Sequence, residues 1–171
     1  MPSFQAVYAK YFDFVWASAR RLGVEASAID DVVQDIFIAI HGRLHTVHRP
    51  EALRSWVYSV ARRTVSNHHR AVRARAGKNS TVVDDQLESH EPTPFDVTQK
   101  NSDLQLVANL LAELDESKRE LLTLVEIEEM TVPEVADALE IPLNTAYSRL
   151  RAARLAFEAA VARHDARGKR K

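Results

Sequence analysis

Cysteine is absent from the 171 residues of the chain. This absence excludes disulfide bonds, thiolate metal sites and cysteine nucleophiles, and it suits a reducing cytoplasm. Glycine is scarce, with 4 residues, and strand-like alternation of polar and apolar residues is rare, which favours an all-α chain. The N-terminus has no signal peptide pattern, and no apolar run approaches the roughly 18 residues of a membrane span. We therefore expect a cytoplasmic protein that does not insert into a membrane.

Charge is distributed unevenly along the chain, although the net charge is only −1. Residues 1–78 contain 12 Lys or Arg and 6 Asp or Glu, a net charge of +6. Residues 79–140 contain 3 basic and 16 acidic side chains, a net charge of −13, and residues 141–171 contain 8 and 2, a net charge of +6. Two basic blocks therefore flank an acidic middle, and each block is a candidate surface for nucleic acid.

The first block has apolar residues at helical spacing, which predicts helices over about 4–22, 27–44 and 51–75. In the second helix, Ser27 is the expected N-cap, with Asp30 three residues later. Its apolar stripe comprises Ile29, Val32, Val33, Ile36, Phe37 and Ile40. Its opposite face has the polar residues Asp31, Gln34 and Asp35. We expect residues 1–76 to form a helical bundle.

The third predicted helix combines a buried stripe with a basic face. Trp56 falls on the stripe, so we expect it in the core rather than as a stacking platform. The other face comprises Arg54, Tyr58, Arg62, Arg63, Ser66, Asn67 and Arg70. Such a face provides cations for phosphates and an amide, from Asn67, for a base edge.

Residues 77–101 are polar and acidic, contain two prolines and lose the helical periodicity, which predicts a flexible acidic linker. A second small helical domain is expected over 102–162, followed by a basic tail over 163–171, whose last six residues, "ARGKRK", are expected to fray. Asp115 or Ser117 is the expected cap of a helix that buries Leu121, Leu122 and Val125.

Residues 131–157 have the pattern of a helix-turn-helix. A short helix with an apolar face is separated by the corner Glu140-Ile141-Pro142 from a second helix with Ala146 on its core side. On a helical wheel, Asn144, Ser148 and Arg151 lie opposite the core. The flanks contain Thr145, Tyr147, Arg149 and Arg154. This layout suits a recognition helix, and a left-handed Glu140 at the corner costs on the order of 1 kcal/mol.

Together, the two basic blocks resemble the sigma factors of bacterial RNA polymerase, specifically the compact extracytoplasmic-function (ECF) group. The resemblance rests on "AIDDVVQDIFIAIHGRL", "LRSWVYSVARRTVSNHHR" and "LLAELDESKRELLTLVEIEEMTVPEVADALEIPLNTAYSRLRAAR", in this order. It covers about residues 5–75 and 103–160. Three positions depart from the family pattern: Asp115 stands where proline is common, Glu140 where glycine is common, and Tyr147 where lysine or arginine is common.

The resemblance implies partners and site residues. Core RNA polymerase would bind through its β′ clamp helices and β flap, promoter DNA would be the second partner, and an anti-sigma factor would be a further one. The face with Asp31, Gln34 and Asp35 would contact the clamp helices. The candidate contacts to the −10 element are His48, Arg49, Arg54, Tyr58, Arg62, Arg63, Asn67 and Arg70, with Glu51 as a further wall of a flipped-base pocket. The candidate contacts to the −35 element are Asn144, Thr145, Tyr147, Ser148, Arg149, Arg151 and Arg154, of which Tyr147, Ser148 and Arg151 would read base edges.

Two other functional classes stay open at the level of sequence. A stand-alone helix-turn-helix regulator with an N-terminal interaction domain would bind a symmetric operator without polymerase, and a protein-binding adaptor would contact no DNA. An enzyme is not expected, because no nucleophile constellation or phosphate-binding loop is present. His41, His45 and His48 have a metal-like spacing, but Arg43 lies among them and no carboxylate completes the set, so no metal or cofactor is expected.

Overall fold

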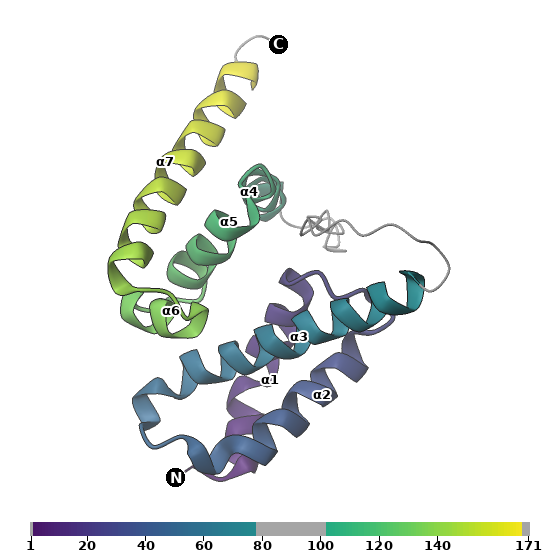
Figure 1. Cartoon of the computed structure of the whole chain (residues 1–171). Helices are drawn as coiled ribbons and strands as arrows, with labels where there is room; N and C mark the ends of the chain where they lie inside the picture. The colour runs from purple at the N-terminus through teal and green to yellow at the C-terminus, as the bar shows by residue number, and fades with distance from the viewer. Residues whose placement is uncertain (1, 78–101, 169–171) are drawn as a thin grey trace. The chain divides into compact units, whose positions relative to one another are not determined.

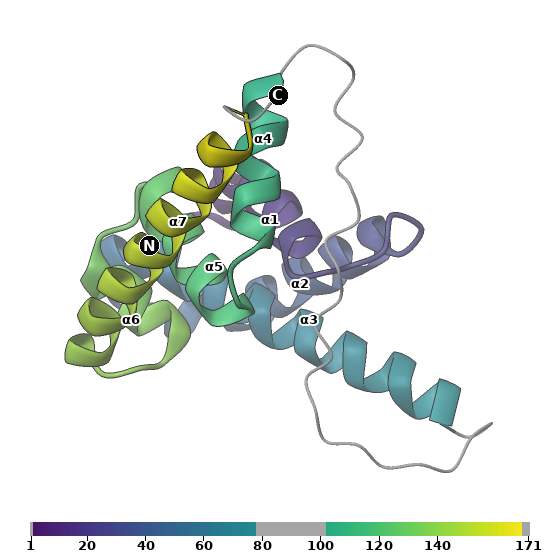
Figure 2. The same cartoon turned by 90° about the horizontal axis from the view of Figure 1, so that it is seen from above.

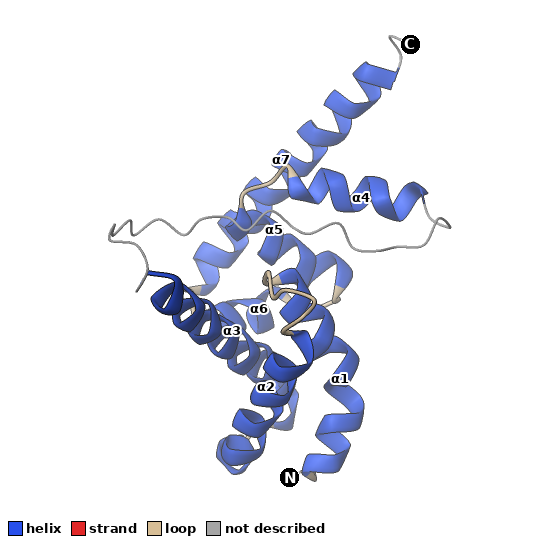
Figure 3. Ribbon diagram, turned by 90° about the vertical axis from the view of Figure 1, so that its right-hand side faces the viewer, coloured by secondary structure: helices blue, strands red, loops and turns tan. Residues whose placement is uncertain are grey.

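The computed structural model describes residues 2–77 and 102–168. The chain divides into two compact units, Met1–His90 and Glu91–Lys171. Within the described residues every regular element is helical and no strand occurs (Figures 1 and 3), which confirms the all-α prediction. No helix in this part of the chain is long and apolar enough to cross a membrane. The linker predicted over 77–101 lies outside the described residues from residue 78 onward.

The N-terminal unit comprises α1 (Phe4–Arg21), α2 (Ile29–Arg43) and α3 (Leu53–Gly77), and each of these helices packs against the other two (Figure 1). The predicted stripe of α2 is buried from Ile29 to Ile40, and Ile36 is completely enclosed. Residues 70–76, at the end of α3, are all exposed where this helix extends beyond α1 and α2 (Figure 2). The packed part of α3 is thus a scaffold, and its end is an exposed surface.

Backbone hydrogen bonds close the end of α1 tightly. The N–H of Val24 donates to the carbonyl of Ala19 at 3.1 Å, and Gly23 between α1 and α2 adopts φ 86°. Glycine accepts this left-handed conformation because it has no Cβ. The Nε2–H of His69 on α3 donates to the carbonyl of Leu22 at 2.9 Å. A side chain of the basic helix therefore satisfies a carbonyl left free at the end of α1.

Two predicted helix starts in this unit are wrong. Ser27 does not cap α2, because the helix begins at Ile29 with Ala28 as its N-cap and no side-chain cap bond. The third helix begins at Leu53 rather than Glu51, since Pro50–Ala52 forms a separate 3₁₀ turn, η2, after a first 3₁₀ turn, η1 (Leu44–Thr46). Proline fixes φ and cannot donate a hydrogen bond, which favours such a short turn ahead of the helix.

The C-terminal unit contains α4 (Ser102–Ala112), α5 (Glu116–Leu122), the π turn η3 (Thr123–Ile127), α6 (Val132–Leu139) and α7 (Leu143–Gly168). The long helix α7 packs against α4, α5 and α6. It continues to Gly168, so the predicted basic tail is helical over residues 163–168, and the fraying expected from residue 166 onward does not occur at 166–168. Residues 169–171 lie outside the described residues.

The π turn changes which residues enter the core. Leu121, Leu122, Thr123 and Leu124 are buried in succession, whereas one face of an α-helix would not bury four consecutive residues. Val125, expected in the core, is only half-buried, and Leu124 is buried in its place with 1% of its surface exposed. The extra residue of a π turn shifts the register of the residues that follow, which α-helical periodicity does not anticipate.

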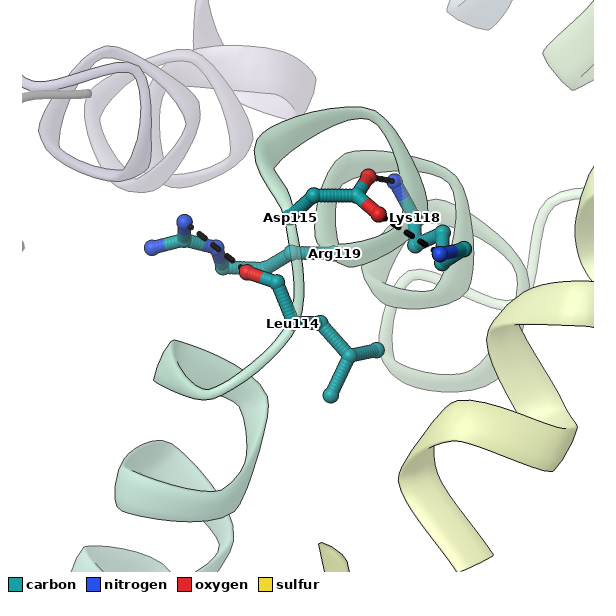
Figure 4. Close-up of polar contacts among 4 residues, drawn as sticks. All are labelled: Leu114, Asp115, Lys118 and Arg119. Atoms are coloured by element: carbon teal, nitrogen blue, oxygen red, sulfur yellow. Dashed lines mark hydrogen bonds and ion pairs between the residues drawn. The ribbon is translucent and has the colours of Figure 1, made fainter. Parts of the chain in front are cut away.

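Asp115 caps α5 (Figure 4). Its Oδ1 accepts a hydrogen bond from the backbone N–H of Lys118 at 3.0 Å, and its Oδ2 lies 2.7 Å from Lys118 Nζ. The adjacent carbonyl of Leu114 accepts a hydrogen bond from Arg119 Nη2 at 3.3 Å. The side-chain and backbone hydrogen bonds from Lys118 lower the pKa of the Asp115 carboxyl below its ordinary value. A cap thus replaces the proline common at this position in the family that the sequence resembles.

Replacing Asp115 with alanine should lower the free energy of unfolding of the C-terminal unit by about 0.5–2 kcal/mol. Since the pKa of Asp115 is lower in the folded state, its contribution exists above the unfolded-state pKa and is lost as the pH falls through the folded-state pKa. Denaturant unfolding followed by far-ultraviolet circular dichroism at neutral and acidic pH would measure both effects. The Asp115→Asn variant retains a capping oxygen and should cost less. Both tryptophans, Trp16 and Trp56, lie in the N-terminal unit. The unfolding midpoint measured by tryptophan fluorescence should therefore be the same in the variants as in the wild type.

Candidate nucleic-acid interface

A capping box starts the first helix of the predicted helix-turn-helix. The side chain of Thr131 accepts a hydrogen bond from the N–H of Glu134 at 3.4 Å, while Glu134 Oε2 accepts one from the N–H of Thr131 at 2.8 Å. These reciprocal bonds satisfy two of the free N–H groups at the start of α6. Helix α6 then buries Val135, Ala136, Ala138 and Leu139 against its neighbours. The sequence Thr-Val-Pro-Glu therefore fixes where the motif begins.

Glu140 forms the corner of the motif in the predicted left-handed conformation, with φ 56° and ψ 43°. The turn is closed by a hydrogen bond of 3.0 Å from the N–H of Ile141 to the carbonyl of Ala136. A second glutamate, Glu129, has φ 53° ahead of α6. A side chain with a Cβ is strained in this conformation, so α6 lies between two strained residues.

Glycine at the corner should stabilise the unit. We expect Glu140→Gly to raise its free energy of unfolding by about 0.5 kcal/mol, because the strain of a left-handed Cβ exceeds the extra entropy of an unfolded glycine. Glu140→Ala, which retains the Cβ and removes the rest of the side chain, is the control and should not stabilise. Equal stability of the glycine and alanine variants in thermal unfolding would contradict this explanation.

The first turns of α7 present the predicted recognition surface. Ala146, Leu150 and Ala153 are buried, as the helical wheel predicts. The exposed residues are Asn144, Tyr147, Ser148, Arg149, Arg151 and Arg154, and Thr145 is half-buried. The hydroxyl of Ser148 donates to the carbonyl of Thr145 at 3.0 Å, which leaves its oxygen available as an acceptor. One face of the helix thus offers hydroxyl, amide, aromatic and guanidinium groups together.

Arg154 is engaged within the unit. Its Nε and Nη2 donate to the same oxygen, Glu126 Oε1, at 2.9 and 2.7 Å. Glu126 lies in the π turn, 28 residues earlier in the chain. This pair was not predicted from the sequence, because helical spacing does not reveal contacts between separate elements.

A shallow hollow adjoins this surface on α7. It is lined by Val132, Tyr147, Leu150, Arg151, Arg154, Leu155 and Glu158. Leu155 is 58% exposed there. Leu155 is not among the residues predicted from the sequence, although a leucine outside the apolar face, one turn after Arg151, was a signal for it. Apolar side chains beside an arginine suit the thymine methyl groups and base edges of a major groove.

The N-terminal unit has a different surface on α2. Asp31, Gln34 and Asp35 are exposed, as predicted. Of these three, Gln34 also lines a hollow, together with Phe4, Tyr8, Phe12, Asp30, Val33, Phe37, Ile38 and His41. The rings of Tyr8 and Phe37 are 4.6 Å apart, and Ile38 is 62% exposed. The apolar side chains of this surface were not predicted from the sequence. Ile38 was the one indication, because it is an apolar residue outside the predicted buried stripe. Carboxylates beside exposed aromatic rings suit a protein partner.

Most of the predicted basic face of α3 is accessible. Arg62, Arg63, Asn67 and Arg70 are exposed, as are His48, Arg49 and Glu51 in the preceding turns. Arg54 is half-buried, and its guanidinium carbon lies 5.0 Å from the centre of the Phe14 ring. This stacking restrains Arg54 against α1.

Two aromatic residues of α3 differ in burial. The placement of Tyr58 on the polar face is wrong, because the residue is only 3% exposed and its ring packs near Phe14. The buried stripe of α3, which includes Leu53, Val57 and Val60, is broad enough to include it. Trp56 is half-buried against the core. Among the described residues no group of three His, Asp or Glu side chains could hold a metal ion.

Comparison with known proteins decides the family. Residues 7–75 match the family described as Sigma-70 region 2, and residues 104–157 match Sigma-70, region 4. The chain is 30% identical over 139 residues to the RNA polymerase sigma factor NccH of Alcaligenes xylosoxydans xylosoxydans, covering 80% of this chain and 75% of that protein. The chain belongs to the sigma-70 family. The ECF RNA polymerase sigma factor SigL of Mycobacterium tuberculosis is a further relative, 28% identical over 153 residues, with 85% and 81% of the two chains covered.

Solved structures of sigma factors share the fold. CnrH in complex with the cytosolic domain of CnrY matches with a TM-score of 0.61 and 24% identity, over 92% of this chain and 86% of that one. The sigma factor RpoE of Bartonella quintana, in complex with the anti-sigma factor NepR, matches with a TM-score of 0.71 and 18% identity, over 92% and 96%. The identification as an ECF-type RNA polymerase sigma factor is therefore confirmed, and the stand-alone regulator is not favoured. The matched regions contain α2 and α3 in region 2 and the α6–α7 motif in region 4.

Proposed function

We propose that this sigma factor binds core RNA polymerase and two promoter elements at once, and that it promotes strand opening at the downstream element. The observation that carries the proposal is the exposed recognition face of α7, from Asn144 to Arg151, on a helix-turn-helix in a region 4 segment. An exposed face of hydroxyl, amide and guanidinium groups on such a helix suits the major groove. Tyr147, Ser148 and Arg151 read base edges of the −35 element, and flanking residues hold phosphates.

Each of the two units is assigned its own binding function. Residues 1–76 bind core polymerase and the −10 element, residues 102–162 bind the −35 element, and residues 77–101 join them. The basic segment 163–171 follows the second domain. Joining two DNA-binding modules raises the effective concentration of the second contact once the first has formed. Each module therefore needs only modest affinity of its own.

Strand opening at the −10 element is assigned to α3 and the turns before it. Exposed Arg62, Arg63 and Arg70 supply cations for the phosphates, and Asn67 supplies donor and acceptor groups to a base. His48, Arg49 and Glu51 form the walls for an extruded base, since such pockets read a flipped base by its edges and faces. Tyr58 is buried in this structure, which argues against a direct contact between its side chain and the DNA.

The protein partners are assigned to chemically different surfaces. The acidic and aromatic surface of α1 and α2 binds the β′ clamp helices through Asp31, Gln34 and Asp35, and the C-terminal unit contacts the β flap. Two of the structural neighbours are in complexes with CnrY and with NepR. An anti-sigma factor is accordingly assigned as a third partner, competing with polymerase for these surfaces.

Catalysis of RNA synthesis is assigned to the polymerase, and the complex works in the cytoplasm. Run-off transcription with purified core polymerase on a promoter library tests the proposal. We expect transcripts only when the sigma factor is added, from promoters that share two sequence elements. Binding to a symmetric site without polymerase would instead favour the stand-alone regulator. If no member of the library supports initiation with the sigma factor, the proposed function is overturned.

A further inference from the structure

The contact between Arg154 and Glu126 joins the recognition helix to the π turn. Two donors of Arg154, Nε and Nη2, lie within 2.9 Å of one carboxylate oxygen. The side chains of Arg154 and Glu126 are 54% and 47% exposed, so the pair is open to solvent and to an incoming ligand. Exposed ion pairs contribute little to stability, because water and salt compete for both partners. This pair can therefore exchange without unfolding the unit.

The donors that Glu126 occupies are those a DNA phosphate would use. A guanidinium binds carboxylate and phosphate oxygens through the same N–H fork. Arg154 lines the same hollow as Tyr147 and Arg151, so its side chain lies at the proposed DNA surface. A phosphate that approached it would meet the Glu126 carboxylate at close range, and the like charges would repel.

We propose that Glu126 limits the affinity of this sigma factor for DNA by acting as an internal substitute for a phosphate on Arg154. When upstream promoter DNA binds, a phosphate replaces the carboxylate. Fewer counterions are then released in total from the DNA than on binding to an unpaired arginine, because the displaced Glu126 carboxylate itself attracts a cation. The inference rests on the proposed function of α6 and α7 in promoter binding.

The chain contains a matched control for this inference. On the same helix, Arg163 pairs with Glu113 at 2.8 Å, and these side chains are 54% and 40% exposed. Arg163 lies nine residues beyond Arg154, about 13 Å farther along the helix axis. Glu113→Gln therefore changes the net charge as Glu126→Gln does, but at a distance at which salt screens exposed charges.

The test compares variants of the full-length sigma factor in complex with core polymerase. Binding to a promoter fragment is measured over a range of salt concentrations. Glu126→Gln should bind several-fold more tightly at about 0.1 M salt, where the Debye length of about 10 Å is shorter than the distance to the control pair, and the slope of log K against log salt should steepen by about one unit. Glu113→Gln should change neither quantity. In an Arg154→Gln background, Glu126→Gln should have no effect, because the donor that it frees is gone.

Each result has a distinct meaning. An unchanged or weakened affinity of Glu126→Gln would show that Glu126 only braces α7, and would overturn the inference. An equal effect of Glu113→Gln, or a full effect in the Arg154→Gln background, would overturn it by showing a general charge effect. Failure of the wild-type complex to bind any promoter fragment would overturn the proposed function, and the inference with it.

Discussion

Replacing Ile36 with alanine is expected to lower the free energy of unfolding of the N-terminal unit by about 2–5 kcal/mol. Ile36 has no exposed surface, and it lies in the middle of α2 within the core that α1 and α3 complete. Truncation removes buried apolar atoms and leaves a cavity that close-packed neighbours fill only in part. Such a loss is a large fraction of the stability of a small domain.

The same helix supplies the control. Ile38 lies two residues away and is 62% exposed, so Ile38→Ala makes the same chemical change at little cost to stability. Trp16 and Trp56 both pack partly against this core, so tryptophan fluorescence should follow its unfolding. A shift in the denaturant midpoint for Ile36→Ala alone is the expected result. Equal shifts for the two variants would contradict the assignment of the core.

Replacing Arg151 with alanine is expected to cost about 1–3 kcal/mol of promoter binding and to relax base preference at one position of the upstream element. Arg151 is exposed on the recognition face of α7 and lies beside Tyr147 in the hollow there. An arginine that donates two hydrogen bonds to guanine discriminates against other bases, because they do not present the same pair of acceptors.

Arg149→Ala is the matched comparison, because it removes an arginine of the same helix that lies on its flank. A phosphate contact carries no base information, so this variant should weaken binding to all promoters by a similar factor. Transcription from a library randomised at the upstream element, with each variant in complex with core polymerase, distinguishes the two outcomes. If Arg151→Ala weakened transcription from all promoters by a similar factor, the proposed base-reading role of Arg151 would be contradicted.

Local patterns in the sequence predicted the features that depend on helical periodicity and capping chemistry. The stripe of α2 and the left-handed Glu140 follow from spacing and residue type over a few positions, and the same signals placed the cap of α5 at Asp115 or Ser117, of which the structure has Asp115. The resemblance to sigma factors was found in the same way, from motifs in order along the chain. These features need no knowledge of contacts between distant segments.

The features that the sequence did not predict depend on how separate elements meet. The π turn moves Leu124 into the core in place of Val125, and the pairing of Arg154 with Glu126 requires that turn and α7 to be adjacent. The burial of Tyr58 likewise depends on the neighbouring helix, because a tyrosine is compatible with either face. The roles of the individual site residues stay predictions.

The two left-handed glutamates that flank α6 also affect how readily this protein can be evolved in the laboratory. Glu129 and Glu140 each occupy a backbone conformation that glycine adopts without strain. Every glutamate codon becomes a glycine codon by a single base change, so one point mutation is enough to remove the backbone strain at each position. Stabilising changes that leave function intact allow a protein to tolerate other, destabilising ones. A selection for new promoter preferences in α7 could therefore begin from a Glu129→Gly, Glu140→Gly background.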